Sequence, residues 1–298
     1  YVLEEGPSND WFQDRIVLTL AILCGASAIA FFYRAFTARH PIVDLRSFAD
    51  RNFAAGSAFS FVMGIGLYGL TYLYPLYLAR VGGYSALQIG ETMFVTGICM
   101  FFMAPVAGFL SRKLDPRIMM GLGFIGFAIG TWLVTGLTKD WDFWELFLPQ
   151  VFRGVSLMIC MVPINNIALG TLPPDRVKNA SGLYNLTRNL GGAVGLAVIN
   201  TILDNRFDLH FARLRESLTW SRSSVDETIA GLTLKLQALG SDAGLAALKT
   251  LSDIVRREAM VMSFADVFYL LTFLFLALAC ALPLVRKPAP SVGGAAGH

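Results

Sequence analysis

Charged residues are scarce in this chain of 298 residues. Asp, Glu, Lys and Arg make up 15% of the chain and hydrophobic residues 55%, whereas a soluble domain carries about 25% charged residues. The mean hydropathy is +0.58. This composition leaves too little polar surface to cover a water-soluble globule of this size. The formal net charge of +3 is small, so the sequence gives no sign of a nucleic-acid partner.

Residues that commonly build metal, redox or nucleotide sites are also few. The three histidines are scattered, and neither an HExxH motif nor a phosphate-binding glycine loop with Lys-Ser/Thr occurs. The four cysteines lie inside apolar runs and form no CxxC pair, so we interpret them as small packing residues and expect neither metal nor cofactor: Cys24, Cys99, Cys160 and Cys280.

Seven long apolar stretches dominate the sequence. A membrane-spanning helix needs about 20 mostly apolar residues. A membrane β-strand is about half that length and alternates in polarity, which these stretches do not. We therefore predict an all-α membrane protein with about seven transmembrane helices, the second broken near its end by Pro75, at residues 16–36, 53–78, 87–110, 118–137, 143–169, 181–203 and 263–285.

Basic residues in the links predict the orientation. Lys and Arg gather in the links 37–52, 111–117 and 170–180 and after Val285, and they are sparse in the alternate links. Because basic loops stay in the cytoplasm, the C-terminal tail is expected to be cytoplasmic. The long link 204–262 then faces outward. It mixes both signs of charge and has helix-like patches, which predicts folded or semi-folded matter outside the membrane, with a surface-lying amphipathic helix as one alternative.

Arg188 is an ionisable residue inside a predicted span. An ionisable group is costly in hydrocarbon and is a functional candidate by default. Asn185 shares its helical face, and Gly191 and Gly195 form a groove for a partner helix. Arg188 either lines a pathway or extends its side chain toward the cytoplasmic headgroups.

Three other ionisable residues lie in or near spans. Glu91 is either a proton-titrating carboxylate or an interfacial acid that is solvated or pairs with Arg80. Arg153 either reaches outward to the headgroups or faces the bundle interior. Asp266 opens the last predicted span and is interpreted as its N-cap.

Polar and aromatic residues in two further spans could line a cavity. Asn165 and Asn166 follow Pro163, whose ring removes a backbone hydrogen bond and favours a kink. They line a cavity or bond across helices. Tyr68 and Tyr72 are four residues apart and share one face, which turns either to a cavity or to lipid.

Several segments together resemble a known family. The chain is similar to the carboxy-terminal half of major facilitator superfamily drug:proton antiporters, in particular EmrB-like members of the fourteen-span EmrB/QacA branch. The segments that carry the resemblance are DWF (10–12), HPIVDLRSFADRNF (40–53), YPLYLARVGGYSALQIG (74–90), APVAGFLSRKLDPR (104–117), VPINNIALGTLPPD (162–175), ASGLYNLTRNLGGAVG (180–195) and ADVF (265–268). The block from LPPD to GGAVG is the most specific.

The resemblance implies a domain organisation. Residues 1–52 would hold an outer segment, one of two extra helices that join the halves, and a cytoplasmic loop. Residues 53–285 would form a six-helix half with the long periplasmic loop 204–262, followed by a cytoplasmic tail at 286–298. The resemblance also implies a partner that this sequence lacks, the amino-terminal half of the transporter, which usually carries the acidic residues of proton coupling. EmrB-like members lie in the bacterial inner membrane and pair with a periplasmic adaptor and an outer-membrane channel, so the resemblance implies the same location and possible partners here.

The superfamily's cytoplasmic loop signature is only partly present. Gly108 is kept and Arg117 fits, but Arg112 stands where the family has an acid and Asp115 where it has a later glycine. We keep Gly108, Arg112 and Arg117 as a candidate gating loop. The departure from the pattern weakens any inference about gating that is drawn from it.

The resemblance implies part of a proton-driven multidrug exporter of apolar or amphipathic compounds, whose two halves rock around a midplane cavity and so give alternating access. Export of a narrow substrate, such as a siderophore, fatty acid or antibiotic, is the alternative. A membrane enzyme or receptor is less favoured, because no catalytic His, Asp or Glu converge at a membrane boundary. The expected pathway residues are Tyr68, Tyr72, Asn165, Asn166, Asn185 and Arg188, with Glu91 as the candidate proton-linked residue.

Overall fold

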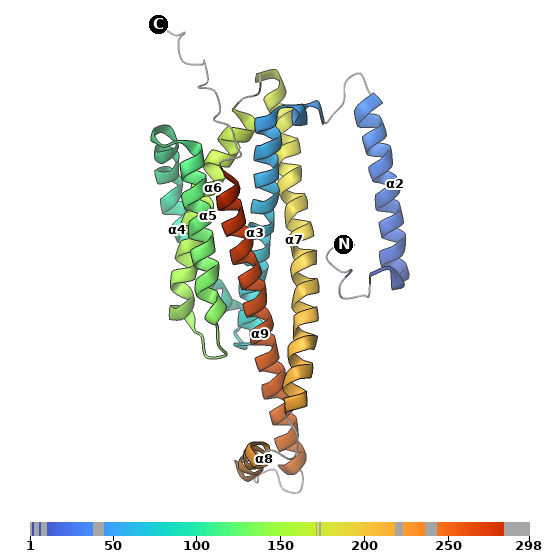
Figure 1. The fold of residues 1–298 in the computed structure, drawn as a ribbon, viewed down its shortest axis with the longest axis vertical. Coiled ribbons are helices and arrows are strands. Elements are labelled where there is room, and N and C mark those ends of the chain that lie inside the picture. Colours follow the sequence, from blue (N-terminus) through green and yellow to red (C-terminus); the bar gives the residue numbers. More distant parts are fainter. Residues whose placement is uncertain are drawn as a thin grey trace.

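The computed structural model describes residues 2, 6, 11–37, 45–170, 172, 174–217, 223–235 and 243–282. Every regular element within these ranges is a helix, and seven helices are long and apolar enough to cross a membrane (Figure 1). This confirms the predicted fold class. The predicted tail at 286–298, with the basic residues that follow Val285, lies outside the described residues.

Five spans agree with the sequence prediction to within three residues at each end. The predicted break at Pro75 was wrong, because the second of these helices continues through the proline to Arg80. The helices are α2 (Arg15–Thr37), α3 (Arg51–Arg80), α4 (Ala86–Lys113), α5 (Pro116–Leu133), which a short η4 (Val134–Gly136) extends, and α6 (Phe143–Leu169).

Side-chain caps fix where these helices begin. Asp50 accepts hydrogen bonds from two backbone N–H groups at the start of α3. Capping boxes, formed by Ser85 with Gln88 and by Asp142 with Glu145, open α4 and α6. Such residues satisfy backbone donors that have no partner within the helix. Short polar links therefore set the ends that length and hydropathy only approximate.

A hydrogen bond joins two of these links at one end of the bundle. The Tyr84 hydroxyl donates to Asp142 Oδ1. The bond raises the pKa of Tyr84 to about 12 and lowers the pKa of Asp142, since it favours the neutral phenol and the charged carboxylate. The turn between α3 and α4 is thereby tied to the turn before α6.

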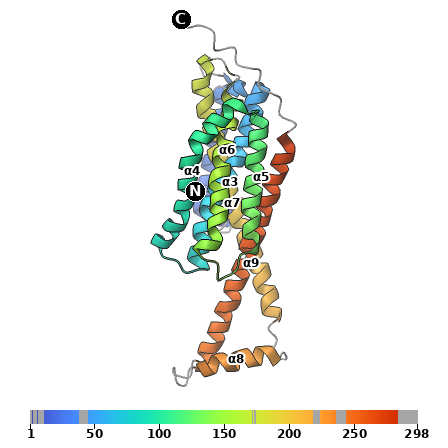
Figure 2. The same cartoon turned by 90° about the vertical axis from the view of Figure 1, so that its left-hand side faces the viewer.

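The last two spans are much longer than predicted. Helix α7 covers Pro174–Ser217 and α9 covers Ala243–Ala281, against predicted spans of 181–203 and 263–285. The polar ends of both helices extend beyond the bundle, and α8 (Ser223–Lys235) lies across them (Figure 2). Much of the 204–262 link is therefore helix. Hydropathy finds only the apolar part of such a helix, whereas its backbone hydrogen bonds continue equally well in water.

Asp266 does not cap a helix, as the sequence suggested. It lies well inside α9, where His210 Nε2 is 2.8 Å and Arg206 Nε 3.6 Å from its Oδ2. Both partners belong to α7. This cluster joins α7 and α9 where they leave the bundle on the side of α8, hereafter the α8 end.

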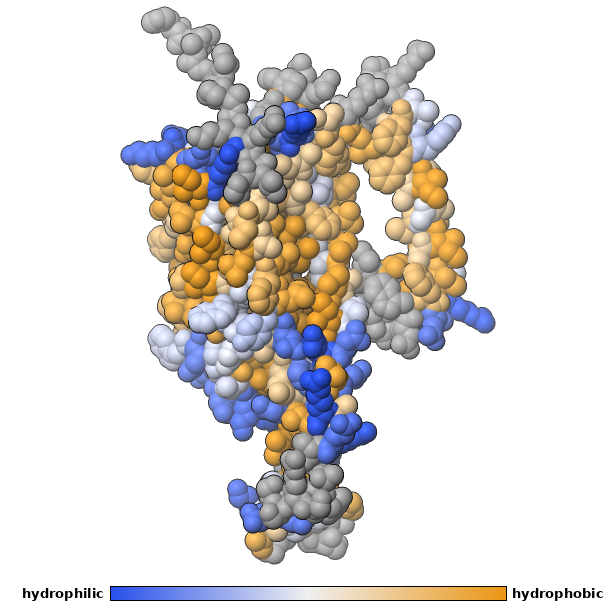
Figure 3. All heavy atoms as spheres, in the orientation of Figure 1, coloured by the Kyte–Doolittle hydropathy of each residue, from blue (hydrophilic) through white to orange (hydrophobic). Residues whose placement is uncertain are grey.

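The helices from α3 to α7 form a bundle with α9, while α2 stands apart (Figure 1). Within the bundle, α3 packs on α7, α7 on α9, α9 on α5, α5 on α6 and α6 on α4. Helices α3 and α6 also touch, whereas α3 and α4 meet little. On the face shown in Figure 3, apolar side chains cover the middle of the bundle and polar side chains gather at the α8 end.

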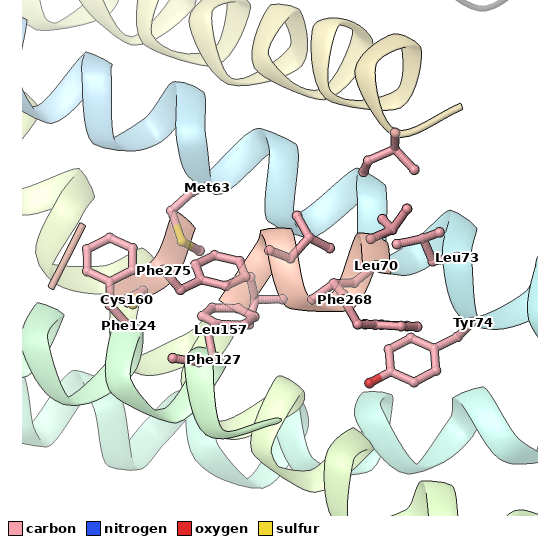
Figure 4. Close-up of a cluster of buried hydrophobic side chains, with 14 of the residues drawn as sticks. Met63, Leu70, Leu73, Tyr74, Phe124, Phe127, Leu157, Cys160, Phe268 and Phe275 are labelled. Atoms are coloured by element: carbon pink, nitrogen blue, oxygen red, sulfur yellow. The ribbon is translucent and has the colours of Figure 1, made fainter. Parts of the chain in front are cut away.

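Aromatic rings fill the centre of the bundle. Phe127 of α5 stacks on Phe275 of α9 with ring centroids 4.8 Å apart. The Thr272 hydroxyl donates to Thr131 Oγ1 at 2.9 Å, so a polar contact also joins these helices. Figure 4 shows the rings packed between α3, α5, α6 and α9, with Tyr74 at one end of the cluster.

Glycines let α3 and α7 approach closely. A Cβ at Gly64 would lie 2.0 Å from the Arg188 carbonyl oxygen, and one at Gly191 would lie 2.0 Å from the Phe61 carbonyl oxygen. At Gly195 the nearest atom would be Ile65 Cα, at 2.9 Å. The predicted groove at Gly191 and Gly195 is confirmed, and α3 occupies it.

We expect Gly191→Ala to destabilise the protein by about 1–3 kcal/mol, because the new methyl group has only backbone to displace. Gly182→Ala is the matched control in the same helix, since nothing lies within 4 Å of a Cβ there. Thermal unfolding of both variants in detergent measures the difference. Equal melting temperatures would contradict the packing described.

Candidate functional site

A small pocket lies between α3, α6 and α7. Its cavity volume of about 10 Å³ is close to the room that one water molecule needs. Most of its walls are apolar, and a hydroxyl, a phenol and a guanidinium add polar groups. The lining residues are Ser60, Met63, Leu67, Leu157, Met161, Ile164, Tyr184 and Arg188.

Hydrogen bonds hold the polar side chains beside this pocket. Arg188 Nη2 donates to Asn185 Oδ1 at 2.8 Å, one turn away on α7. The Tyr68 hydroxyl donates to Asn189 Oδ1 at 2.9 Å and so bridges α3 to α7. The Tyr68 ring lies against Gly192, where a Cβ would come within 2.2 Å of it. Arg188, Asn185 and Tyr68 are thus brought together, with Arg188 lining the pocket.

The other expected pathway residues lie outside the pocket lining. Tyr72 is half-buried on α3, one turn beyond Tyr68. On α6, Asn165 is half-buried and Asn166 is exposed, while their neighbours Met161 and Ile164 line the pocket. Neither asparagine lines the pocket, and a role for the two in the pathway stays a prediction.

Glu91 and the candidate gating loop are separate from the pocket. Glu91 is exposed on α4, and it forms no ion pair with Arg80. Near the opposite end of α4, the Gly108 carbonyl accepts a hydrogen bond from Ser111 Oγ at 2.9 Å. Arg112 is exposed in the last turn of α4, and Arg117 is half-buried in the first turn of α5.

Arg153 forms a buried polar network that sequence reasoning did not assign. It is 5% exposed, and its guanidinium donates to Thr71 Oγ1 of α3 and, at 3.4 Å, to Gln150 Oε1. Thr96 of α4 donates to the same Gln150 oxygen. The guanidinium carbon lies 5.6 Å from the Tyr74 ring centroid. Of the two alternatives left open for Arg153, the structure shows the bundle interior.

The only sequence signal for this network was the arginine itself. Thr71 is 82 residues from Arg153, and Thr96 is 54 residues from Gln150, so no local pattern connects them. Arg153 is ten residues into α6, or about 15 Å along the helix axis. It therefore lies near mid-depth of a hydrocarbon core of about 30 Å.

The sequence matches one family model. Residues 10–196 match the family model of the Major Facilitator Superfamily. The chain belongs to this superfamily. It is EmrB-like within the superfamily, as the sequence resemblance predicted.

Curated relatives of the superfamily support that assignment. The chain is 37% identical over 274 residues to the colistin resistance protein EmrB of Acinetobacter baumannii, covering 92% of this chain and 54% of that protein. It is 28% identical over 298 residues to the fatty acid resistance protein FarB of Neisseria gonorrhoeae, covering 100% and 57%. The multidrug export protein EmrB of Escherichia coli K12 is 27% identical over 297 residues, covering 99% and 57%.

The chain spans about half the length of these relatives. Seven apolar helices and the superfamily assignment together make it a multi-pass protein of a bacterial inner membrane. The names of these relatives describe export or resistance.

The hydrogen bond from Tyr68 to Asn189 should be measurable as a coupling energy. A double-mutant cycle of Tyr68→Phe and Asn189→Ala is expected to give about 0.6 kcal/mol, the average for such bonds between membrane helices. Unfolding in sodium dodecyl sulfate supplies the four stabilities. Tyr72→Phe paired with Asn189→Ala should give no coupling; a zero value for the Tyr68 pair as well would argue against the bond.

Proposed function

We propose that this chain is the carboxy-terminal half of a proton-driven multidrug exporter of apolar or amphipathic compounds. The supporting observation is a polar cluster within the depth of the membrane, where Arg188 lines a pocket between α3, α6 and α7, donates a hydrogen bond to Asn185 and lies near the Tyr68–Asn189 bridge. Ionisable groups are rare at that depth and mark substrate pathways. The pocket itself has room for about one water molecule, so the apolar side chains around it would be one part of a wider pathway formed with the other half.

Alternating access would use this half as one rigid body. In secondary transporters the substrate site lies near the bilayer midplane, between two halves that rock against each other. Glycine-mediated packing of α3 on α7 fixes one side of the proposed pathway face. The basic side of the membrane domain would be cytoplasmic, with the candidate gating loop at Gly108, Arg112 and Arg117 on that side.

The extensions of α7 and α9, with α8, would project into the periplasm. A periplasmic adaptor and an outer-membrane channel would then be the partners of this end, as the family resemblance implies. Because the described parts of the extensions are helical, they would offer such an adaptor an ordered surface to bind.

A narrow substrate range is the second candidate. The names of two relatives, a colistin resistance protein and a fatty acid resistance protein, differ in the chemistry of the compound resisted. Relatives with similar sequences are therefore linked to resistance against chemically different compounds. Export measured over a panel of cationic, neutral and anionic compounds in a pump-deficient strain separates a broad from a narrow range.

We expect Arg188→Ala to lower export about tenfold or more, since a lost hydrogen bond to a charged group is worth about 1.5–3 kcal/mol. The chain replaces the matching 274-residue stretch of the Acinetobacter relative, and dye export is followed in a pump-deficient strain with and without a proton gradient. Arg213→Ala, on the exposed extension of α7, is the control. The proposed role of Arg188 is wrong if its variant exports like the unchanged chimera. The 298-residue chain alone in proteoliposomes should transport nothing.

Glu91 is proposed as a proton-linked residue, and Glu91→Gln tests it. An amide cannot bind the proton that a carboxylate binds, so we expect gradient-driven export by the same chimera in proteoliposomes to be lost while substrate binding changes less than about twofold. Glu216→Gln, an exposed acid on the extension of α7, is the control. Export at the unchanged rate would exclude Glu91 from proton coupling.

A further inference from the structure

The proposed function leaves Arg153 without a role, although Arg153 is more deeply buried than Arg188. Its hydrogen bonds go to the neutral oxygens of Gln150 and Thr71. No carboxylate among the described residues lies within ion-pair distance of it. The ion pairs found in those residues join α7 and α9 through Asp266 at the α8 end.

An unpaired buried charge is expensive. Removing a guanidinium from water costs several kcal/mol, and neutral hydrogen bonds recover only part of that cost. The face of Tyr74 offsets a further share through a cation–π contact. A Leu or Met at this position would avoid the cost altogether. The charge therefore indicates a function that needs a cation at mid-depth.

The guanidinium lies just beneath the proposed pathway face. Thr71, which accepts its hydrogen bond, is exposed on α3. Tyr68 is three residues earlier on α3 and is also exposed, so the two share a helical face. The exposed Thr71 side chain therefore lies between that face and the guanidinium.

We propose that Arg153 recognises the carboxylate of anionic amphipathic substrates. This proposal rests on the proposed export function and names its substrate class. The planar guanidinium can donate two parallel hydrogen bonds to a carboxylate, which an ammonium cannot do. Arg188, which lines the pocket, is about 11 Å from Arg153 along the helix axes, because the Arg188 backbone faces Gly64 of α3 and Arg153 bonds to Thr71, seven residues further along α3. No acidic side chain lines that pocket, so cationic head groups find no counter-charge there.

The test compares two probes with the same twelve-carbon tail, dodecanoate and dodecyltrimethylammonium. Each is equilibrated at pH 8 with the 298-residue chain in nanodiscs, and binding to empty nanodiscs is subtracted. We expect Arg153→Gln to weaken dodecanoate binding about tenfold or more, as for a lost charge-assisted bond of about 1.5 kcal/mol. Binding of dodecyltrimethylammonium should change less than twofold. Arg213→Gln on the α7 extension should leave both affinities unchanged.

Thr71→Val protects the test against misfolding of the Arg153 variant. Valine keeps the shape of threonine but removes the internal acceptor, so the guanidinium becomes free for the ligand. Dodecanoate should then bind about threefold more tightly, with the ammonium probe unaffected. The proposal is overturned if Thr71→Val leaves dodecanoate binding unchanged, or if Arg153→Gln weakens both probes equally or neither. Because binding is measured without a gradient, selective binding without export by the chimera would refute the proposed function alone.

Discussion

The backbone contact between α3 and α7 is the constraint on which the proposed pathway depends. Lipid is as apolar as leucine, so membrane helices gain little from burying apolar side chains against each other and associate through close packing. Gly64 and Gly191 each face a carbonyl oxygen of the opposite helix with no room for a side chain. That approach brings Tyr68 to Asn189 and sets Arg188 at the pocket. The polar residues are thus positioned by glycines that have no chemistry of their own.

The sequence predicted the membrane-spanning part of the fold well because hydrocarbon thickness dictates the length of each apolar run. It failed for α7 and α9, since a helix that leaves the membrane continues in polar residues that hydropathy does not detect. What holds those extensions is visible only in three dimensions. Asp266 meets His210 across 56 residues of sequence, and nothing local in either segment indicates the pair.

The candidate site divides in the same way. Arg188, Asn185 and Tyr68 could be found because polar residues stand out in apolar runs and helical spacing shows which of them share a face. Asn165 was expected at the pocket, yet Ile164 lines it. One residue turns a helix by about 100°, and a composition argument cannot fix that rotation. Arg153 was noticed, but its environment depends on Thr71, 82 residues away.

The network around Arg153 also bears on how a ligand could influence the helices. Helix α4 meets α3 little, so α6 connects them at mid-depth, through Thr96 to Gln150 on one side and Arg153 to Thr71 on the other. A carboxylate at Arg153 competes with Thr71 for the same N–H groups, whereas the Thr96–Gln150 bond needs no exchange. Ligand binding would therefore loosen α6 from α3 and leave α6 joined to α4. Because a ligand shifts a conformational equilibrium only through unequal affinity for its states, such an exchange of partners is a direct physical means by which substrate could favour one arrangement of the half over another.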